Sequence, residues 1–405
     1  MNNEHMKMQK NIIHPKSSEK MKAAINELIS ITRIENRIPR LDFVPKYFED
    51  IATELNKRKE KTKINIFQCM ITYFHKVSYF YTYILEKDID YSTDEVPPKE
   101  RDELIEFIYN AFFNCPSSYT ISFRFNDLLL PEHDINKNIK IRTVKSHQLA
   151  LGLFGNSQKN ESEVEFYGTG LYTPYTKSDF LKEYLHDLNT FLYFITEHGL
   201  VISKEKTDDQ PEFALGLYAE HDRHLIKKYT ATIMDDNYPK ELFTEPLPLS
   251  ISKYISSLEI KPNGNKKPGD IINVISNTIN HLIEDQSSEA KRIRMAIGWY
   301  MNSSYNEDDT MAFLQICMGL EAIFGDDQDQ GGLTKMLADR CAYLIGKNIN
   351  QRRKIRESFG KIYTIRSKIV HGVINRLSDD DKFMRNYAKG LLQAALKKEI
   401  VNLEY

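Results

Sequence analysis

Apolar residues recur at helical spacing through the last third of the chain. From Thr310 to Phe324 they occupy two faces of one segment, which predicts the most buried helix of the set. The same spacing predicts four further helices, over Ala290 to Ser303, Leu333 to Ile345, Arg352 to about Val370, and Asp380 to Val401. Short polar or glycine-containing joints separate these segments, so the sequence predicts an antiparallel helical bundle over residues 270–405.

The first half of the chain has a mixed pattern. Helical spacing predicts helices over Ser18 to Ile31, Val44 to Asn56, Lys63 to Leu85, Lys99 to Phe113, and Ser178 to His198. Between the last two, apolar and polar residues alternate over 119–125, and shorter stretches at 139–143 and 163–167 have strand character. We therefore expect a mostly α-helical protein with an α+β N-terminal region.

Stretches without helical or strand periodicity divide the chain into four parts. Residues 1–16 are polar and are expected to form a disordered tail, and residues 17–238 form the α+β region, a candidate sensor or regulatory domain. Prolines and glycines concentrate in 239–269, which predicts a linker before the bundle at 270–405.

Composition narrows the class of protein. Hydrophobic residues make up 41% of the chain and charged residues 28%, with a formal net charge of −2, as is ordinary for a soluble globular protein. No apolar run is long enough to span a membrane, and the N-terminus lacks a signal-peptide core, so we expect a cytoplasmic protein without a membrane partner.

The sequence predicts neither a metal site nor a cofactor. The four cysteines, Cys69, Cys115, Cys317 and Cys341, show no C-x-x-C spacing and indicate reduced, buried thiols. His221 and His224 have no convincing third ligand nearby, and no glycine-rich phosphate loop with its lysine is present.

The segment from Tyr363 to Gly372 carries the main candidate chemistry. Arg366 lies four residues after Ile362 and three before Ile369, in the middle of an apolar stripe, where a permanently charged guanidinium needs a partner. His371 follows five residues later, and Gly372 is a helix stop. The alternative is structural: Arg366 pairs with a carboxylate on a neighbouring helix, and His371 caps helix carbonyls.

The context of this segment resembles a known family. The run "AIGWYMNSS…DDTMAFLQICMGLEAIFG…LTKMLADRCAYLIG…FGKIYTIRSKIVHG" is similar to the HEPN superfamily, in particular to the ApeA-like HEPN group of prokaryotic defence proteins. The similarity covers about the last third of the chain. It implies an all-α bundle, frequent dimerisation and, in many members, metal-independent endoribonuclease activity acting in anti-phage defence. The family motif, an arginine, often a polar residue, and a histidine after four to six positions, maps onto Arg366, Ser367 and His371. Ser367 stands where many active members have asparagine, aspartate or histidine.

The residue types suit RNA cleavage by the substrate's own 2′-hydroxyl. Histidine exchanges protons near neutral pH, and arginine presents a planar fork of donors to phosphate oxygens. Five residues correspond to about 140° of rotation around an ideal helix, so Arg366 and His371 do not converge in one straight helix. Either the helix ends near Val370 and releases His371, or two chains pool their motifs at a twofold dimer contact, which is the hypothesis we favour.

Positive charge concentrates around this motif. The candidate RNA-binding residues are Arg352, Arg353, Lys354, Lys361 and Lys368, although the same pattern also describes an ordinary solvated helix face. Ser367, Tyr363 and Glu321 are candidate supporting residues, and Glu321 is expected to pair with Arg366 or Arg340.

Three functions therefore remain open: an endoribonuclease with RNA as partner and a phage-derived trigger, a silent RNA- or nucleotide-binding module, and a dimerisation domain.

Overall fold

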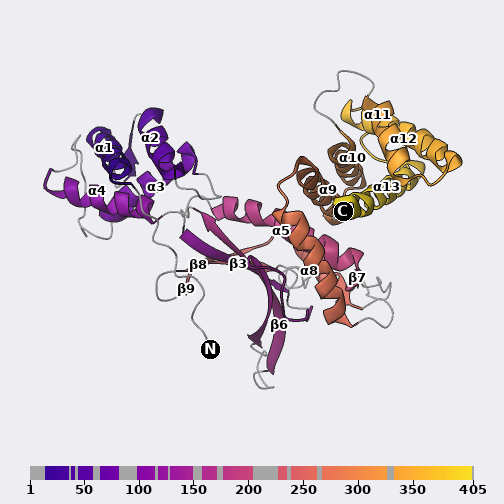
Figure 1. Cartoon of the computed structure of the whole chain (residues 1–405), viewed down its shortest axis with the longest axis horizontal. Coiled ribbons are helices and arrows are strands. Elements are labelled where there is room, and N and C mark those ends of the chain that lie inside the picture. The colour runs from indigo at the N-terminus through magenta and orange to yellow at the C-terminus, as the bar shows by residue number, and fades with distance from the viewer. Residues whose placement is uncertain are drawn as a thin grey trace, which may run out of the picture. The chain divides into compact units, whose positions relative to one another are not determined.

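The computed structural model describes most of the chain. The described residues are 14–35, 38–41, 44–57, 64–81, 98–114, 117–125, 128–148, 157–170, 177–203, 227–234, 239–261, 267–325 and 333–403. They contain twelve helices and a small antiparallel sheet, and fall into two compact units (Figure 1). The first unit comprises Met1–Thr120, Tyr167–Leu181 and Thr232–Glu241, and the second comprises Ile121–Phe166, Lys182–Ala231 and Leu242–Tyr405.

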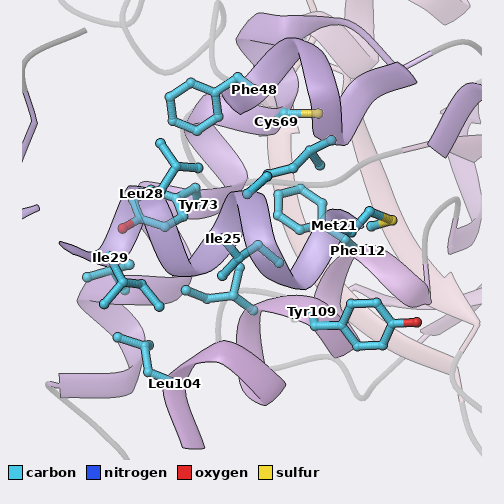
Figure 2. Packing of buried hydrophobic residues seen from close by; sticks show 14 of the residues in the cluster. Met21, Ile25, Leu28, Ile29, Phe48, Cys69, Tyr73, Leu104, Tyr109 and Phe112 are labelled. Atoms are coloured by element: carbon cyan, nitrogen blue, oxygen red, sulfur yellow. The ribbon is translucent and has the colours of Figure 1, made fainter. Parts of the chain in front are cut away.

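Four helices make up most of the first unit: α1 (Pro15–Ile31), α2 (Pro45–Asn56), α3 (Ile66–Tyr79) and α4 (Pro98–Phe113). Proline occupies the first helical position of α1 and α2, where its missing N–H costs nothing. A capping box between Asn65 and Gln68 starts α3. The apolar faces of all four helices meet in one core, and Figure 2 shows its centre around Phe48 and Tyr73.

The sheet lies mainly in the second unit. Its six strands are β3 (Ser117–Phe125), β4 (His133–Asp134), β5 (Ile139–Gln148), β6 (Ser157–Gly170), β8 (Lys228–Met234) and β9 (Pro239–Pro246). Their order is β4-β5-β6-β3-β8-β9, and β4, β5 and β6 pair antiparallel, with Ile141 opposite Val164. The strands predicted at 119–125, 139–143 and 163–167 are therefore confirmed as parts of β3, β5 and β6. Two short pairs, β1 (Arg33–Glu35) with β2 (Ile38–Arg40) and β7 (Val201–Ser203) with β10 (Leu258–Ile260), complete the described strands.

The predicted linker at 239–269 is wrong over most of its length. Residues 239–246 form strand β9 of the sheet, followed by α7 (Leu249–Ser256) and then β10. Proline and glycine mark only the boundaries: Pro239 and Pro246 are the first and last residues of β9, and Pro248 caps α7. The predicted disordered tail, 1–16, is wrong at its end, because α1 begins at Pro15; residues 1–13 lie outside the described part of the chain.

The C-terminal helices are α8 (Pro268–Glu284), α9 (Ser288–Tyr305), α10 (Asp309–Phe324), α11 (Leu333–Ile345), α12 (Ile349–Val370) and α13 (Asp379–Leu403). They confirm the predicted helical bundle. Side chains of Ser287, Asp308 and Asn348 accept backbone N–H groups at the starts of α9, α10 and α12. These caps fix where each helix begins and therefore which residues of α10 and α12 face each other.

The bundle is joined to helix α5 (Lys177–Glu197) within the second unit. Buried Glu197 accepts hydrogen bonds from the Tyr300 hydroxyl on α9 (3.3 Å) and from Gln393 Nε2 on α13 (2.6 Å), and pairs with Lys397 (2.8 Å). The Tyr305 hydroxyl donates to Asn189 at 2.9 Å. The structure therefore divides the chain differently from our expectation, because residues 17–238 are shared between both units.

Candidate functional site

Helix α12 presents Arg366 at the centre of its packing face. Its buried residues are Ile355, Phe359, Ile362, Tyr363 and Ile365. Arg366 lies seven residues, about two helical turns, after Phe359 and therefore on the same side of the helix. Its side chain keeps 34% of its surface exposed, so the guanidinium reaches solvent although Arg366 lies within the packed face.

Glu321 on α10 is the partner of Arg366. Its Oε1 lies 3.1 Å from Arg366 Nη2, and its Oε2 accepts a hydrogen bond from the same nitrogen at 3.4 Å. The Glu321 side chain is 25% exposed. This confirms the expected ion pair and assigns it to Arg366, whereas Arg340 donates to the Phe324 carbonyl at 2.6 Å. An ion pair at this depth fixes the direction of the guanidinium.

Two further polar groups gather around this pair. The buried Tyr363 hydroxyl has a pKa raised well above its usual value, first by burial and then by the negative charge of Glu321. Burial and Glu321 also raise the pKa of the Cys317 thiol. The Tyr363 hydroxyl and Glu321 Oε1 are buried atoms without a hydrogen bond of standard geometry in the described structure. Tyr363 and Cys317 are therefore neutral at physiological pH, and Glu321 and Arg366 carry the charges of this cluster.

His371 lies at the other end of the predicted motif and is exposed. It is the last residue of the α12 cap, with its backbone N–H donating to the Ser367 carbonyl at 3.0 Å, and Gly372 follows with a φ of 69° that favours glycine. Within the described part of the chain, the imidazole has no recorded hydrogen bond or ion pair. Ser367 is also exposed.

A single chain does not bring Arg366 and His371 together. The helix remains regular to Val370, so the two side chains leave it in directions about 140° apart. The helix end that the first alternative predicted near Val370 is confirmed, because Val370 is the last residue of α12 and His371 is its C-cap.

The predicted RNA-binding residues divide into two groups. Arg353, Lys354, Lys361 and Lys368 are exposed, and the three lysines follow one another at seven-residue spacing, so they form a row along one side of α12. Arg352 is instead half-buried: its Nε donates to the Gly346 carbonyl at 3.1 Å, and its guanidinium lies 4.9 Å from the Tyr343 ring centre. The lysine row lies on the side of α12 that Arg366 does not occupy.

The sequence reasoning missed two participants. Cys317 was interpreted only as a core thiol, although its spacing of four residues from Glu321 places both on one side of α10. Tyr343 was not singled out at all. The sequence did contain a pattern that could have identified it. Asp339 and Tyr343 are four residues apart on α11, and Arg352 and Arg356 are four apart on α12, so the two pairs face each other when the helices run antiparallel.

Comparisons with known proteins find no relative of this chain. No protein-family model, no curated protein and no solved structure matches it. In the described residues, no three His, Cys, Asp or Glu side chains are grouped as a metal ion would require, and none of the described helices has the length and apolar character to cross a bilayer. His221, His224 and Cys115 lie outside the described residues.

Proposed function

We propose that this protein is a metal-independent endoribonuclease of the HEPN type, with Arg366 and His371 as its catalytic residues. The observation that carries the proposal is the placement of Arg366: its guanidinium pairs with Glu321 in the packed face of α12 but is one-third exposed, and an exposed histidine ends the same helix. A purely solvated helix face does not place an arginine among buried apolar residues.

The proposed reaction is a transesterification within the RNA strand. The 2′-hydroxyl oxygen attacks the neighbouring phosphorus while the P–O5′ bond breaks, which leaves a 2′,3′-cyclic phosphate and a free 5′-hydroxyl. A neutral His371 imidazole accepts the 2′-hydroxyl proton, and an imidazolium returns a proton to the leaving O5′. Arg366 has five N–H donors, and those not directed at Glu321 bind the non-bridging oxygens as negative charge develops on them.

The divergent directions of the two side chains support a composite site formed by two copies of the chain. Exposed apolar residues lie close to His371 in the chain: Val370 and Val373 flank it, and Phe383 follows near the start of α13, with 68% of Val373 and 70% of Phe383 exposed. Apolar side chains this exposed are suited to a twofold contact, which would bring Arg366 of one protomer toward the histidine of its partner.

The first test is cleavage of a single-stranded RNA in EDTA. His371→Ala and Arg366→Lys should each lower cleavage by at least a hundredfold, because one removes the proton carrier and the other keeps the charge for Glu321 but loses the planar fork. His133→Ala on β4 is the matched histidine control and should cleave like wild type. Cleavage at the wild-type rate by both His371→Ala and Arg366→Lys would contradict the assignment of these residues as catalytic.

A mixing experiment tests the composite site. Dimers re-formed from equal amounts of His371→Ala and Arg366→Lys chains should regain about one quarter of the wild-type sites, because half of the dimers are mixed and each carries one intact site. A site formed within one chain gives no recovery, since every chain then lacks one of its two groups.

The defence role is tested in cells. We propose that a phage-derived trigger activates the nuclease and that the N-terminal region senses it. This proposal rests only on the resemblance to the ApeA-like HEPN group. Wild-type protein should stop growth of infected cells and reduce phage yield, and His371→Ala should do neither. Equal protection by both would separate the protein from RNA cleavage.

A catalytically inactive HEPN module is the second candidate. It is favoured by Ser367, where active members often carry asparagine, aspartate or histidine, and by the commitment of Arg366 to Glu321. It predicts RNA binding that weakens steeply with salt, without product.

A further inference from the structure

The second unit contains a cavity between helices α5, α7, α9 and α10. Its volume of about 560 Å³ is within the range of small-molecule sites, about 300–1,000 Å³. No residue of the Arg366 cluster lines it. A mainly apolar wall with a few polar groups is typical of a ligand site, and this wall combines the apolar side chains of Leu185, Leu249, Ile251 and Tyr305 with the carboxamides of Asn302, Asn306 and Gln315.

The fold holds the apolar part of this wall in place. Ile251 and Tyr305 are both buried. The Tyr305 hydroxyl donates to Asn189 at 2.9 Å, and its ring packs edge-on against Tyr254, with 4.9 Å between the ring centres. Leu249, the first residue of α7, keeps 43% of its surface exposed and so remains available for contact. An apolar surface that is already formed reduces the entropy that binding loses.

Two carboxamides in the wall keep hydrogen-bonding groups available. Within the residues that the structure describes, the Asn302 side chain has no recorded hydrogen bond. Gln315 uses its carbonyl, which accepts from Asn306 Nδ2 at 3.3 Å, and its amino group has no recorded bond in the same residues. Asn306 is more committed, because its Oδ1 also accepts the Asp308 N–H at 3.0 Å. The available groups are neutral, and they both donate and accept.

The charges at this cavity compensate each other. Among its described lining residues only Lys253 and Glu307 are charged, and Lys253 Nζ lies 3.0 Å from Glu307 Oε1. An anionic ligand would compete with Glu307 for the ammonium group, whereas a neutral ligand leaves the ion pair intact. The cavity therefore favours an uncharged ligand with an apolar group beside hydrogen-bond donors and acceptors.

We propose that the cavity binds an extended peptide segment of another protein. One apolar side chain of the segment contacts Leu249, Ile251 and Tyr305, and its backbone bonds to Asn302 and Gln315. A peptide group is uncharged and carries one donor and one acceptor, which a carboxamide complements with two hydrogen bonds. Side chains alternate along an extended chain, so one apolar residue enters the cavity while its neighbours point away from it. The proposal does not depend on the nuclease activity.

A small uncharged probe tests this chemistry. N-acetyl-leucine N-methylamide carries one apolar side chain between two peptide groups. Its binding to the full-length protein is followed by saturation-transfer NMR, and for a molecule this small we expect a dissociation constant on the order of 1 mM. N-acetylglycine N-methylamide keeps both peptide groups and lacks the apolar side chain, so it should bind at least about tenfold more weakly.

Four variants locate the binding site. Leu249→Ser and Asn302→Ala should each weaken binding of the leucine probe about fivefold, through lost apolar contact and a lost hydrogen bond respectively. Leu129→Ser and Asn273→Ala are the matched controls: both residues are exposed, neither lines the cavity, and both variants should bind like wild type. Because none of the four residues is buried, the melting curves should stay the same.

Three results would overturn the proposal. The first is equal affinity of the leucine probe for wild type, Leu249→Ser and Asn302→Ala, or no binding to any of them. The second is weaker binding in Leu249→Ser with full binding in Asn302→Ala, which would indicate a site for a purely apolar ligand. The third is displacement of the probe by AMP, which would assign the cavity to nucleotides; we expect AMP to leave the probe bound.

Discussion

Two tyrosines, Tyr73 in the N-terminal helices and Tyr363 in the C-terminal bundle, are both buried but have opposite surroundings. The Tyr73 hydroxyl lies 2.6 Å from Thr32 Oγ1, and because Thr32 donates to the Leu28 carbonyl, Tyr73 is the donor between them. Tyr363 contacts the Glu321 carboxylate, which raises the pKa of its hydroxyl, and the geometry of this contact lies outside that of a standard hydrogen bond. Figure 2 shows Tyr73 among the mostly apolar side chains of this core.

The contrast separates a core built for stability from one that carries charge. In the α1–α4 core, the Tyr73 hydroxyl has a hydrogen-bond partner and its neighbours are mostly apolar. Between α10 and α12, a thiol, a phenol, a carboxylate and a guanidinium are packed together at a cost in desolvation. Buried clusters of polar and charged groups of this kind are expected at functional sites.

Removal of a core phenylalanine from each region should give the largest effects. Phe48 and Phe359 are both fully buried, so Phe48→Ala and Phe359→Ala should each lower the free energy of unfolding by about 3–5 kcal/mol. Trp299 on α9 is the single tryptophan of the chain and reports on the bundle. In urea, Phe359→Ala should shift the Trp299 fluorescence transition, whereas Phe48→Ala should shift the circular-dichroism signal of the N-terminal helices.

The control for this pair is Phe67→Ala. Phe67 on α3 is more than half exposed, so its removal should lower the free energy of unfolding only slightly. An equal shift of the Trp299 transition in Phe48→Ala and Phe359→Ala would show that the two regions unfold as one, and the comparison between their cores would lose its basis.

Much of this contrast was accessible from the sequence, because it depends on local periodicity. The stripe through Phe359 and Ile362 predicted the helix and its packing face, and an arginine within it demanded the carboxylate that Glu321 supplies. Strand β9 was missed because its ends are prolines, which suggested a linker, although its pairing in the sheet is a long-range property. The Tyr343 cluster was missed for the same reason: it depends on the register between α11 and α12.

The ion pair of the bundle should have an intermediate effect. Glu321→Gln leaves Arg366 without its counter-charge and should destabilise the bundle by about 1–2 kcal/mol, less than the 3–5 kcal/mol of a fully buried pair because both groups are partly exposed. Arg366→Met should cost a similar amount. The double variant should be no less stable than either single one, since no unpaired charge remains.

The measurement is a double-mutant cycle in urea, followed by Trp299 fluorescence. Strictly additive losses would mean that the two side chains do not interact in solution, and the interpretation of Glu321 as the group that orients Arg366 would then fail.

Removal of the Tyr73 and Tyr363 hydroxyls should have smaller effects on stability, and their difference tests the comparison directly. Tyr73→Phe removes a hydrogen-bond donor that Thr32 accepts and should lower the free energy of unfolding by about 1 kcal/mol. Tyr363→Phe removes a buried phenol whose contact with the Glu321 carboxylate lies outside standard hydrogen-bond geometry, so the loss of stability should be smaller than for Tyr73→Phe. Matched urea titrations compare the two losses. If Tyr363→Phe costs as much as Tyr73→Phe, the bundle hydroxyl is satisfied and the contrast between the regions disappears.

The smallest expected effect is on the acid stability of the N-terminal helices. Burial, and secondly the charge of Lys76, lowers the pKa of His75 to about 4, against about 6.5 in an unfolded chain. Between these values the unfolded state binds the proton and the folded state does not, so stability is complete above pH 6.5 and falls as the pH drops toward 4. His75→Gln should flatten this part of the curve of melting temperature against pH.

His133→Asn is the matched control, because it removes a histidine from the sheet and not from the α1–α4 core. Its curve should keep the wild-type slope for the N-terminal transition. If His75→Gln also flattened the pH dependence of the bundle's melting temperature by the same amount, the neutral imidazole would stabilise both regions together. An unchanged slope in His75→Gln would instead mean that the half-buried imidazole is protonated in the folded state, and the N-terminal helices would then carry a charge beside their core, as the bundle does at Arg366.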